Sequence, residues 1–209
     1  MNAVRILRAQ PGDAIEVAEL IAEAFESLAV AHWLVPDPAF RRAVLAADMT
    51  ILVEHALAFG HVDLTQDRSA TAVWFRRGTE PVPPPPEYER RLAAACEPWT
   101  DRFRILDAVF QAHQPRAPHH HLAFLAVLPG RQGTGLGSAL LHHHHEYLDR
   151  HRVPAYLEAS SVRSRNLYRR HGYRAGPQFT LPDGPPLRPM WRSPPGSTDD
   201  GVGTERSRT

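Results

Sequence analysis

The stretch LPGRQGTGLGS, residues 128–138, separates an apolar run over residues 122–127 from a helical pattern over residues 137–152. Glycine at every second position from 133 to 137 lets consecutive backbone N–H groups turn to the same side, because no Cβ obstructs them. A helix that begins here adds its macrodipole, so the pattern predicts a binding site for a phosphate or pyrophosphate. The stretch has neither the lysine of a P-loop nor the GxGxxG spacing of a dinucleotide fold. A plain strand-to-helix turn is the alternative interpretation.

The rest of the chain carries strand and helix patterns in alternation. Apolar alternation predicts strands over residues 4–9, 60–65, 70–75, 122–127, 155–159, 174–180 and 187–191. Helical spacing predicts helices over residues 13–27, 39–57, 87–96, 100–113, 137–152 and 164–171. The proline run over residues 80–86 predicts an extended spacer. We therefore expect one α/β (α+β) domain over residues 1–192 and a disordered polar tail over residues 193–209.

The composition is that of an ordinary globular protein. Of the 209 residues, 43% are hydrophobic and 22% are charged, and the formal net charge is +1. So small a net charge provides no long-range field for nucleic acid, and no apolar run is long enough to span a membrane. Cys96 is the single cysteine, which excludes an intrachain disulfide and favours a reducing, cytoplasmic location. We expect Cys96 to be a small buried residue rather than a nucleophile.

The four successive histidines at residues 142–145 suggest a metal site at first sight. Four consecutive side chains, however, point around roughly 400° of a helix, so they cannot all face one ion. The sequence offers no carboxylate or cysteine set that would complete their ligand shell. We therefore expect no metal.

The glycine stretch and its flanks resemble the GNAT superfamily of N-acyltransferases. Residues 132–137 match that family's pyrophosphate motif, [RQ]-x-x-G-x-[GA], and residues 125–129 are similar to its splayed fourth strand. Residues 156–160 and 164–173 resemble its fifth strand and the N-x-x-x-Y-x-x-x-G-[FY] helix, although Asn166 lies only two residues before Tyr168. The resemblance spans about residues 4–191. It implies a mixed, mostly antiparallel central sheet, flanked by helices and splayed between the strands at 122–127 and 155–159.

A subgroup of the family is also similar. The QGxGLGS and LExS patterns, Ala72-Val73-Trp74 and Pro182-Asp183-Gly184-Pro185 resemble the puromycin N-acetyltransferase-like enzymes. This resemblance implies transfer of an acyl group, most simply acetyl, from acyl-CoA to the amine of a small molecule. Antibiotic self-resistance and natural-product tailoring are the roles that it suggests.

The resemblance also implies roles for individual residues. Acetyl-CoA would be the co-substrate. Its pyrophosphate would accept hydrogen bonds from the backbone N–H groups of Gln132, Gly133, Thr134, Gly135, Leu136, Gly137 and Ser138. The N–H group of Val127 would polarise the thioester carbonyl. Tyr168 would be the general acid for the departing thiolate, with packing on a buried helix face as the alternative. Asn166 would contact the pantetheine arm or the ribose region, or else would begin a helix.

The attacking amine needs a base, and Glu158, at the end of a predicted strand, is the first candidate. Its alternative role is that of an electrostatic anchor for a cationic substrate. His61, His119, His120, His121 and Glu54 are weaker candidates. Phe25, His32, Trp33 and Trp74 are predicted to line the amine pocket, where the alternative for Phe25 and Trp74 is a place in the core.

Two other functional interpretations stay open. A related fold can use another activated donor such as aminoacyl-tRNA, which a basic stripe beside the cleft would favour. A CoA-binding protein without turnover is the second, although Glu158 and Tyr168 argue against it. The oligomeric state is left open, with a homodimer as one option.

Overall fold

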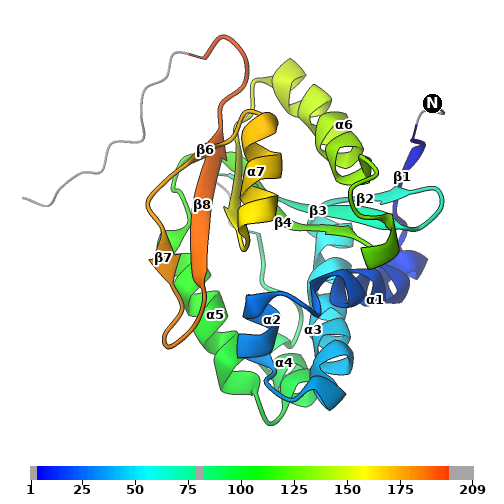
Figure 1. The fold of residues 1–209 in the computed structure, drawn as a ribbon, viewed down its shortest axis with the longest axis vertical. Helices are drawn as coiled ribbons and strands as arrows, with labels where there is room; N and C mark the ends of the chain where they lie inside the picture. The colour runs from blue at the N-terminus through cyan, green and yellow to red at the C-terminus, as the bar shows by residue number, and fades with distance from the viewer. Residues whose placement is uncertain (1–3, 79–81, 198–209) are drawn as a thin grey trace, which may run out of the picture.

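The computed structural model describes residues 4–78 and 82–197, and Figure 1 shows their arrangement as a sheet flanked by helices. The strands are β1 (Ile6–Arg8), β2 (Gly60–Thr65), β3 (Ala70–Arg77), β4 (His119–Val127), β5 (Ala155–Ala159), β6 (Arg174–Ala175), β7 (Phe179–Thr180) and β8 (Pro186–Arg192). The helices are α1 (Ala14–Phe25), α2 (Ala29–Leu34), α3 (Pro38–Phe59), α4 (Tyr88–Cys96), α5 (Thr100–His113), α6 (Leu136–His151) and α7 (Val162–Arg170). Short 3₁₀ turns lie at Pro11–Asp13 and Pro129–Arg131.

The sheet is mixed and mostly antiparallel, as the sequence predicted. Its strand order is β1-β2-β3-β4-β5-β8-β6, and β7 pairs with β8 beside this path. Among the strands described, β4 and β5 are the parallel pair, and the other neighbours run antiparallel. A parallel pair requires a crossover connection, which the glycine stretch and α6 provide.

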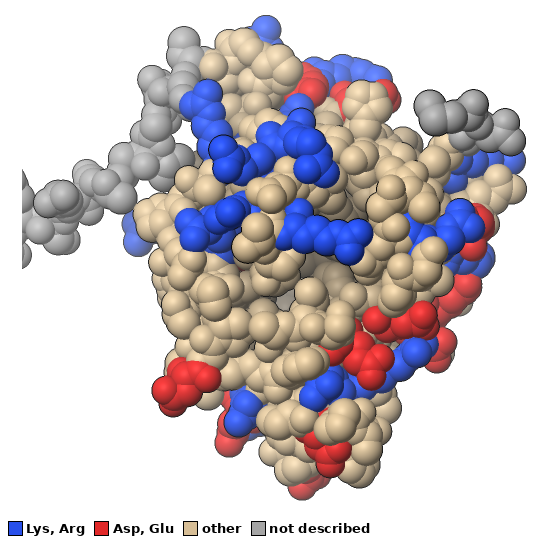
Figure 2. Space-filling model, viewed as in Figure 1, with Lys and Arg blue, Asp and Glu red and all other residues tan. Residues whose placement is uncertain are grey.

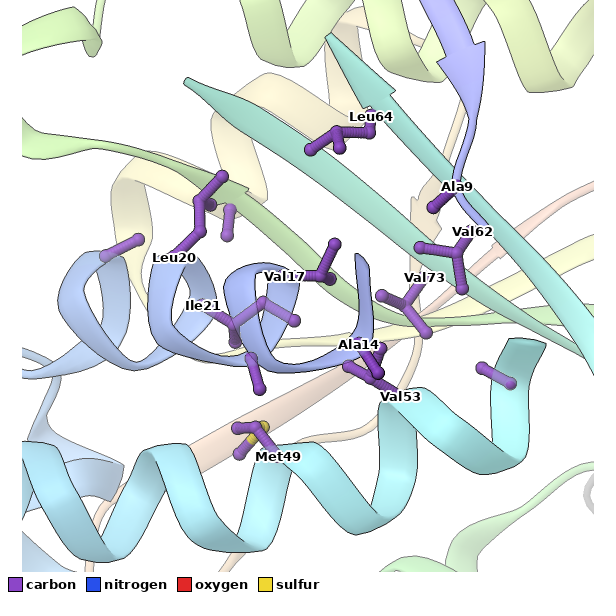
Figure 3. Close-up of a cluster of buried hydrophobic side chains, with 14 of the residues drawn as sticks. Ala9, Ala14, Val17, Leu20, Ile21, Met49, Val53, Val62, Leu64 and Val73 are labelled. Carbon is purple, nitrogen blue, oxygen red and sulfur yellow. The ribbon is translucent and has the colours of Figure 1, made fainter. Parts of the chain in front are cut away.

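The main core lies between one face of the sheet and the helices α1 and α3. Figure 3 shows Ile21 from α1, Val53 from α3 and Val73 from β3 pointing toward one another, and all three side chains are fully buried. Truncating a buried aliphatic side chain such as Ile21 to alanine costs about 2–5 kcal/mol, because contacts are lost and a cavity forms. This core fixes α1 and α3 against the sheet, beside the strand that carries the candidate site.

Capping residues mark where α3 and α7 begin. The Asp37 side chain accepts a hydrogen bond from the Ala39 N–H group (2.9 Å), and Pro38 occupies the first turn of α3. Ser161 caps α7 by accepting from the N–H group of Ser164 (3.0 Å). The helix α6 packs against β2, β3 and β4, and α7 follows β5 (Figure 1).

Three sequence predictions need correction. The strand predicted at residues 122–127 begins at His119, because pairing with β3 and β5 buries three histidines that carry no apolar alternation. The strand predicted at 174–180 is interrupted at residues 176–178, where Pro177 has no N–H group to donate. The six-residue helix α2 was not predicted, since too few residues precede the prolines to establish a helical period.

No helix within residues 4–78 and 82–197 is both long enough and apolar enough to cross a membrane. Glu80 and Pro81 of the proline run, and residues 198–209 of the predicted tail, lie outside the described residues. Residues 193–197 follow β8 without helix or strand.

Candidate functional site

The strands β4 and β5 pair only at their beginning and then separate. His120 is paired with Ala155 and His121 with Tyr156, and no further pairing joins the two strands. A register shift opposite Val73 and Trp74 marks a β-bulge in β4, just beyond the paired residues. Because a bulge bends and twists its strand, it accounts for the divergence. The expected splay is therefore present, between the strands that the sequence indicated.

The separation leaves backbone groups of β4 facing the gap. Leu128 donates its N–H group to the Ser69 carbonyl (2.9 Å), which makes the neighbouring Val127–Ala70 pair a non-hydrogen-bonded pair of the antiparallel ladder. The N–H and C=O groups of Val127 therefore point away from β3, toward the side where β5 has diverged. The Val127 carbonyl accepts a hydrogen bond from Gln132 Nε2 (3.1 Å), and its N–H group has no partner in the described part of the chain.

The glycine stretch forms a loop whose N–H groups are unpaired within the described ranges. Gly133 and Gly135 have φ values of +83° and +91°, in the left-handed region that L side chains rarely adopt. Gly135 precedes the first turn of α6, and none of the N–H groups of residues 133–138 has an acceptor within the described ranges. Thr134 Oγ1 donates to the Arg131 carbonyl (2.6 Å) and braces the turn. Six free donors at a helix N-terminus fit a pyrophosphate.

Arginine side chains surround this loop. Arg163 Nη1 donates to Gln132 Oε1 (2.8 Å), and Arg131 Nη2 pairs with Asp67 Oδ2 (2.7 Å). Together with Arg170, both arginines line the cleft described below. Figure 2 shows basic side chains gathered above a hollow in this face, over α7 and the loop, whereas acidic side chains lie mostly below it. The arrangement suits an anionic ligand because guanidinium groups bind phosphate oxygens in pairs.

One continuous cleft of about 420 Å³ runs from the glycine loop along the splay to an apolar end. This volume is sufficient for part of a small-molecule ligand. The apolar end is formed by side chains from α1, from α2 and its N-cap, and from α3, α5 and β8, and they include Phe25, Leu28, Leu34, Leu45, Met49, Leu106, Phe110 and Leu187. Phe25 also packs edge-on against Phe124 of β4, with ring centroids 6.1 Å apart.

Glu158 is the one carboxylate among the residues that line the cleft. Its Oε2 lies 2.8 Å from His121 Nε2, and the two side chains are only 5% and 6% exposed. The other oxygen, Oε1, is buried without a hydrogen-bond partner in the described part of the chain. The carboxylate also acts electrostatically on Tyr156 and Arg77. A buried carboxylate with one oxygen unpaired can accept a proton or bind a cation.

Tyr168 lies on the same cleft, on the face of α7 that packs against the sheet. Its ring contacts Tyr173 edge-on at 5.8 Å, and burial raises the pKa of its hydroxyl above the ordinary value of 10. The hydroxyl therefore stays protonated at neutral pH and can donate a proton or a hydrogen bond.

Several residues predicted for the site lie outside the cleft. Trp33 packs beneath the loop at residues 182–184, where its Nε1 donates to the Pro182 carbonyl (3.0 Å). Trp74 is fully buried and stacks on His144 on the α6 side of the sheet, in the core position that was its alternative. Asn166 is exposed on α7 and does not line the cleft. Thr134 belongs to the loop but does not line the cleft.

The fold places the weaker candidates for the base in different parts of the molecule. His121 contacts Glu158, whereas His61 and His120 lie near α6, and Glu54 pairs with Arg91 (2.5 Å). His119 packs edge-on against Tyr156 and at a tilt against Trp191. His32 is exposed, and Cys96 is fully buried, as expected of a small apolar residue.

Sequence reasoning named His121 only as a weaker candidate for the base, and it missed the side chains that α5 and β8 contribute to the apolar end. The signal for His121 was its place next to an apolar strand with Glu158 on a neighbouring strand. Leu106, Phe110 and Leu187 carry no motif, because only the packing of α5 and β8 brings them to the cleft.

The comparisons with known proteins agree with this geometry. Residues 103–175 match the family model of the acetyltransferase (GNAT) domain, and this segment contains β4, the glycine loop, α6, β5 and α7. A Corynebacterium glutamicum structure, described as "histone acetyltransferase HPA2 and related acetyltransferase", is 26% identical with a TM-score of 0.72, over 94% of this chain and 99% of that chain.

Two insect enzymes are similar in fold. Arylalkylamine N-acetyltransferase 2 from Aedes aegypti is 14% identical with a TM-score of 0.59, over 92% of this chain and 99% of that one. A Drosophila melanogaster polyamine N-acetyltransferase, which forms N-acetylagmatine, is 16% identical with a TM-score of 0.62, over 91% and 99%. The chain therefore has the GNAT fold that the sequence predicted, with a GNAT acetyltransferase domain match over its central segment.

Proposed function

We propose that this protein transfers an acyl group, most simply acetyl, from acyl-CoA to the amine of a small molecule. The observation that carries the proposal is the single cleft that joins a loop of free N–H donors to an apolar end, with Glu158 between them. If the pyrophosphate of acyl-CoA binds at the loop, its pantetheine arm would lie along the splay. The thioester at the end of that arm would then come near Glu158. The match to a GNAT acetyltransferase domain supports the same reading.

Acyl-CoA would supply an activated thioester, and the residues of this chain would position it and move protons. The N–H groups of residues 133–138 would hold the pyrophosphate, assisted by Arg131 and Arg163. The free N–H group of Val127 would donate to the thioester carbonyl, where negative charge develops during attack. Both contributions depend on the direction of backbone groups.

The side chains would manage two protons. Glu158 would accept a proton from the substrate ammonium, directly or through water, and His121 would hold the carboxylate in place. Tyr168 would give its proton to the departing thiolate at the other side of the cleft. Solvent would restore the phenol and remove the proton from the carboxylate after each turnover, so the cycle balances.

The apolar end of the cleft favours an amine with an apolar or aromatic body. Aliphatic and aromatic side chains form this end, and Glu158 offers the one negative charge along the cleft. A ligand with one cationic amine and an apolar body would satisfy both. Several proteins of this fold bear names that refer to small amines, including arylalkylamines and agmatine. The resemblance to the puromycin-like subgroup adds aminonucleosides, and with them a role in resistance or tailoring, to the acceptors to be tried.

The arginine side chains beside the loop favour a second candidate, a transferase that uses aminoacyl-tRNA. Arg131, Arg163 and Arg170 form the basic border that such a donor would need. The same three residues suit the phosphates of CoA, which requires fewer contacts than tRNA. We therefore rank the acyl-CoA donor first.

Isothermal titration with acetyl-CoA, followed by thiol release with a panel of amines, tests the proposal. The panel contains phenylethylamines, agmatine and aminonucleosides. The Glu158→Gln variant, measured in parallel, gives the thiol release that does not depend on the Glu158 carboxylate. We expect micromolar binding, and thiol release that depends on the amine and is fastest with aromatic amines. Binding without release with any amine would favour a noncatalytic role. No binding of acetyl-CoA would overturn the loop assignment and bring aminoacyl-tRNA forward.

A further inference from the structure

A cluster of histidines surrounds a buried aspartate where α6 packs on β2. The Asp63 side chain is 1% exposed, and its Oδ1 lies 3.0 Å from His61 Nε2 and 3.8 Å from His143 Nε2. Its Oδ2 lies 3.6 Å from His144 Nδ1. Although this oxygen is buried, it has no hydrogen-bond partner in the described part of the chain. The cluster therefore holds an unsatisfied carboxylate oxygen directed at imidazole nitrogens.

These separations match a metal-ligand shell better than a hydrogen-bond network. In a tetrahedral zinc site with bonds of about 2.0–2.1 Å, neighbouring ligand atoms are about 3.3 Å apart. The three distances around Asp63 lie between 3.0 and 3.8 Å, and only the shortest is within the usual range of a hydrogen bond. Ligand atoms of His61, Asp63 and His144 all lie within 4.8 Å of one another.

We propose that His61, Asp63 and His144 form a binding site for a divalent transition metal, with His143 as the fourth ligand. Imidazole nitrogens together with one carboxylate favour Zn²⁺ among the common biological divalent ions, whereas Mg²⁺ and Ca²⁺ prefer oxygen ligands. Consecutive residues of α6 supply two ligands, and residues two apart on β2 supply the others from one face of the strand. The helical run alone could not form the site, because its first and fourth members, His142 and His145, contact Glu146 and Tyr173 instead.

The surroundings hold His144 in the orientation that a ligand needs. Its ring stacks on Trp74, with centroids 4.1 Å apart and an interplanar angle of 12°. Its Nε2 is 3.0 Å from His120 Nδ1, which leaves Nδ1 toward Asp63. Such outer contacts fix the ring and the tautomer of a metal-binding histidine. The ion can enter from the surface, since the side chains of His61 and His143 are 34% and 48% exposed.

One neighbour opposes the metal. The Arg8 guanidinium contacts His61 Nδ1, so this nitrogen accepts and the ring proton lies on Nε2, toward Asp63. Metal binding at Nε2 requires the proton to move to Nδ1, and Arg8 must then turn away. The Arg8 side chain is exposed and also donates to the Gly60 carbonyl (2.9 Å), a bond that water can replace when the side chain turns into solvent. Removing it should therefore strengthen metal binding.

The site is separate from the acyltransfer cleft. None of its four ligands lines that cleft. A shell supplied entirely by the protein is typical of structural zinc. We expect the metal to join β2 to α6 and to raise the stability of the fold by mass action.

Zn²⁺ titration of the EDTA-dialysed protein tests the proposal, with calorimetry and thermal unfolding as readouts. We expect one Zn²⁺ per chain and a rise in Tm, and Co²⁺ should give the intense visible absorption of a four-coordinate site. His61→Gln should weaken binding at least tenfold, and Arg8→Ala should tighten it. His142→Gln is the matched control, because this exposed neighbour in the same run contacts Glu146 rather than Asp63.

The absence of Zn²⁺ binding would overturn the proposal. Equal losses in His61→Gln and His142→Gln, or no loss in either, would do the same, because they would assign binding to surface histidines. Asp63→Asn provides a second arm: it should retain the fold in far-UV circular dichroism and lose the Zn²⁺-dependent rise in Tm. A retained rise would contradict the site.

Discussion

His120 and His121 are neighbours on β4, yet they belong to two regions of different construction. His120 lies under α6, where its Nδ1 meets His144, and burial lowers its pKa to about 3. His121 points to the other side and holds Glu158, which lines the cleft. Because successive side chains of a strand face opposite sides of the sheet, one strand serves both regions. The α6 side buries its histidines within a packed layer, whereas the splayed side leaves backbone donors and one oxygen of Glu158 without partners in the described part of the chain.

The difference teaches where a function can arise on this sheet. Buried polar groups that find partners stabilise the fold, and those left without partners are available to a ligand. On the splayed side the missing partner is β5 itself, since its pairing with β4 ends after two residues. On the α6 side a carboxylate oxygen of Asp63 is also without a partner in the described part of the chain, and it lies among imidazole nitrogens, which is why we place a metal there. Four predictions sharpen or break this contrast.

The largest effect should come from acid on the histidine-rich side. Burial lowers the pKa values of His120 and His145 to about 3 and 2, so these rings stay neutral in the folded protein. Below pH 6.5 the unfolded chain binds protons that the folded chain does not, and stability falls as the pH falls toward the folded values. The slope should approach ~1.4 kcal/mol per pH unit for each histidine.

Urea unfolding followed by tryptophan fluorescence, in EDTA between pH 7.5 and 5, measures this slope. His145→Gln should reduce it by about one histidine's share. His142→Gln should leave it unchanged, since that side chain is 75% exposed. A flat unfolding free energy over this range would contradict a packed layer of neutral histidines.

The second effect tests the open side through Glu158→Gln. We expect turnover to fall about 100-fold or more, because a carboxylate positioned as a base contributes that much, while affinity for acetyl-CoA is kept. A loss in kcat would indicate a base, and a rise in KM for cationic amines would indicate an anchor. Glu146→Gln is the control, because the Glu146 side chain is exposed on the outer face of α6. Activity within twofold of the parent would remove Glu158 from the site.

The third effect concerns the loop. Gly135→Val places a β-branched residue at φ +91°, which costs ~1–2 kcal/mol or more, and acetyl-CoA affinity should fall at least tenfold. Gly130→Val is the matched control, since a Cβ at either glycine would meet no atom within 4 Å and only Gly135 has a positive φ. Titration calorimetry compares the two. Equal losses would mean that side-chain bulk, rather than the direction of the N–H groups, explains the result.

The smallest effect should come from Tyr168→Phe. A thiol has a pKa near 8.5, so its thiolate leaves with little help, and we expect kcat to fall about tenfold or less. Affinity for acetyl-CoA should be kept, because no pyrophosphate contact is removed. Tyr147→Phe on the exposed face of α6 is the control. A matching loss of affinity in Tyr168→Phe would give this ring a packing role.

The glycine loop, the strand before it and the helix after it could be predicted from the sequence alone. Their signals are local: glycine relaxes the backbone at positions 133 and 135, and apolar periodicity marks β4 and α6. The resemblance to the GNAT superfamily indicated Tyr168, and the end of a predicted strand indicated Glu158; both residues line the cleft. Their places on the cleft follow from the parallel crossover.

The rest depended on contacts between distant segments. No local pattern says that Trp33 would pack under residues 182–184, or that Leu106 and Phe110 of α5 would reach the cleft. The histidines at 142–145 could be judged only as one helix, which argued against a metal, since the aspartate that they approach lies about eighty residues earlier on β2. The sequence by itself determined the backbone chemistry of the loop, because the conformational freedom of glycine does not depend on distant contacts. Only the tertiary structure decided which side chains share a surface, because packing brings together residues that no spacing relates.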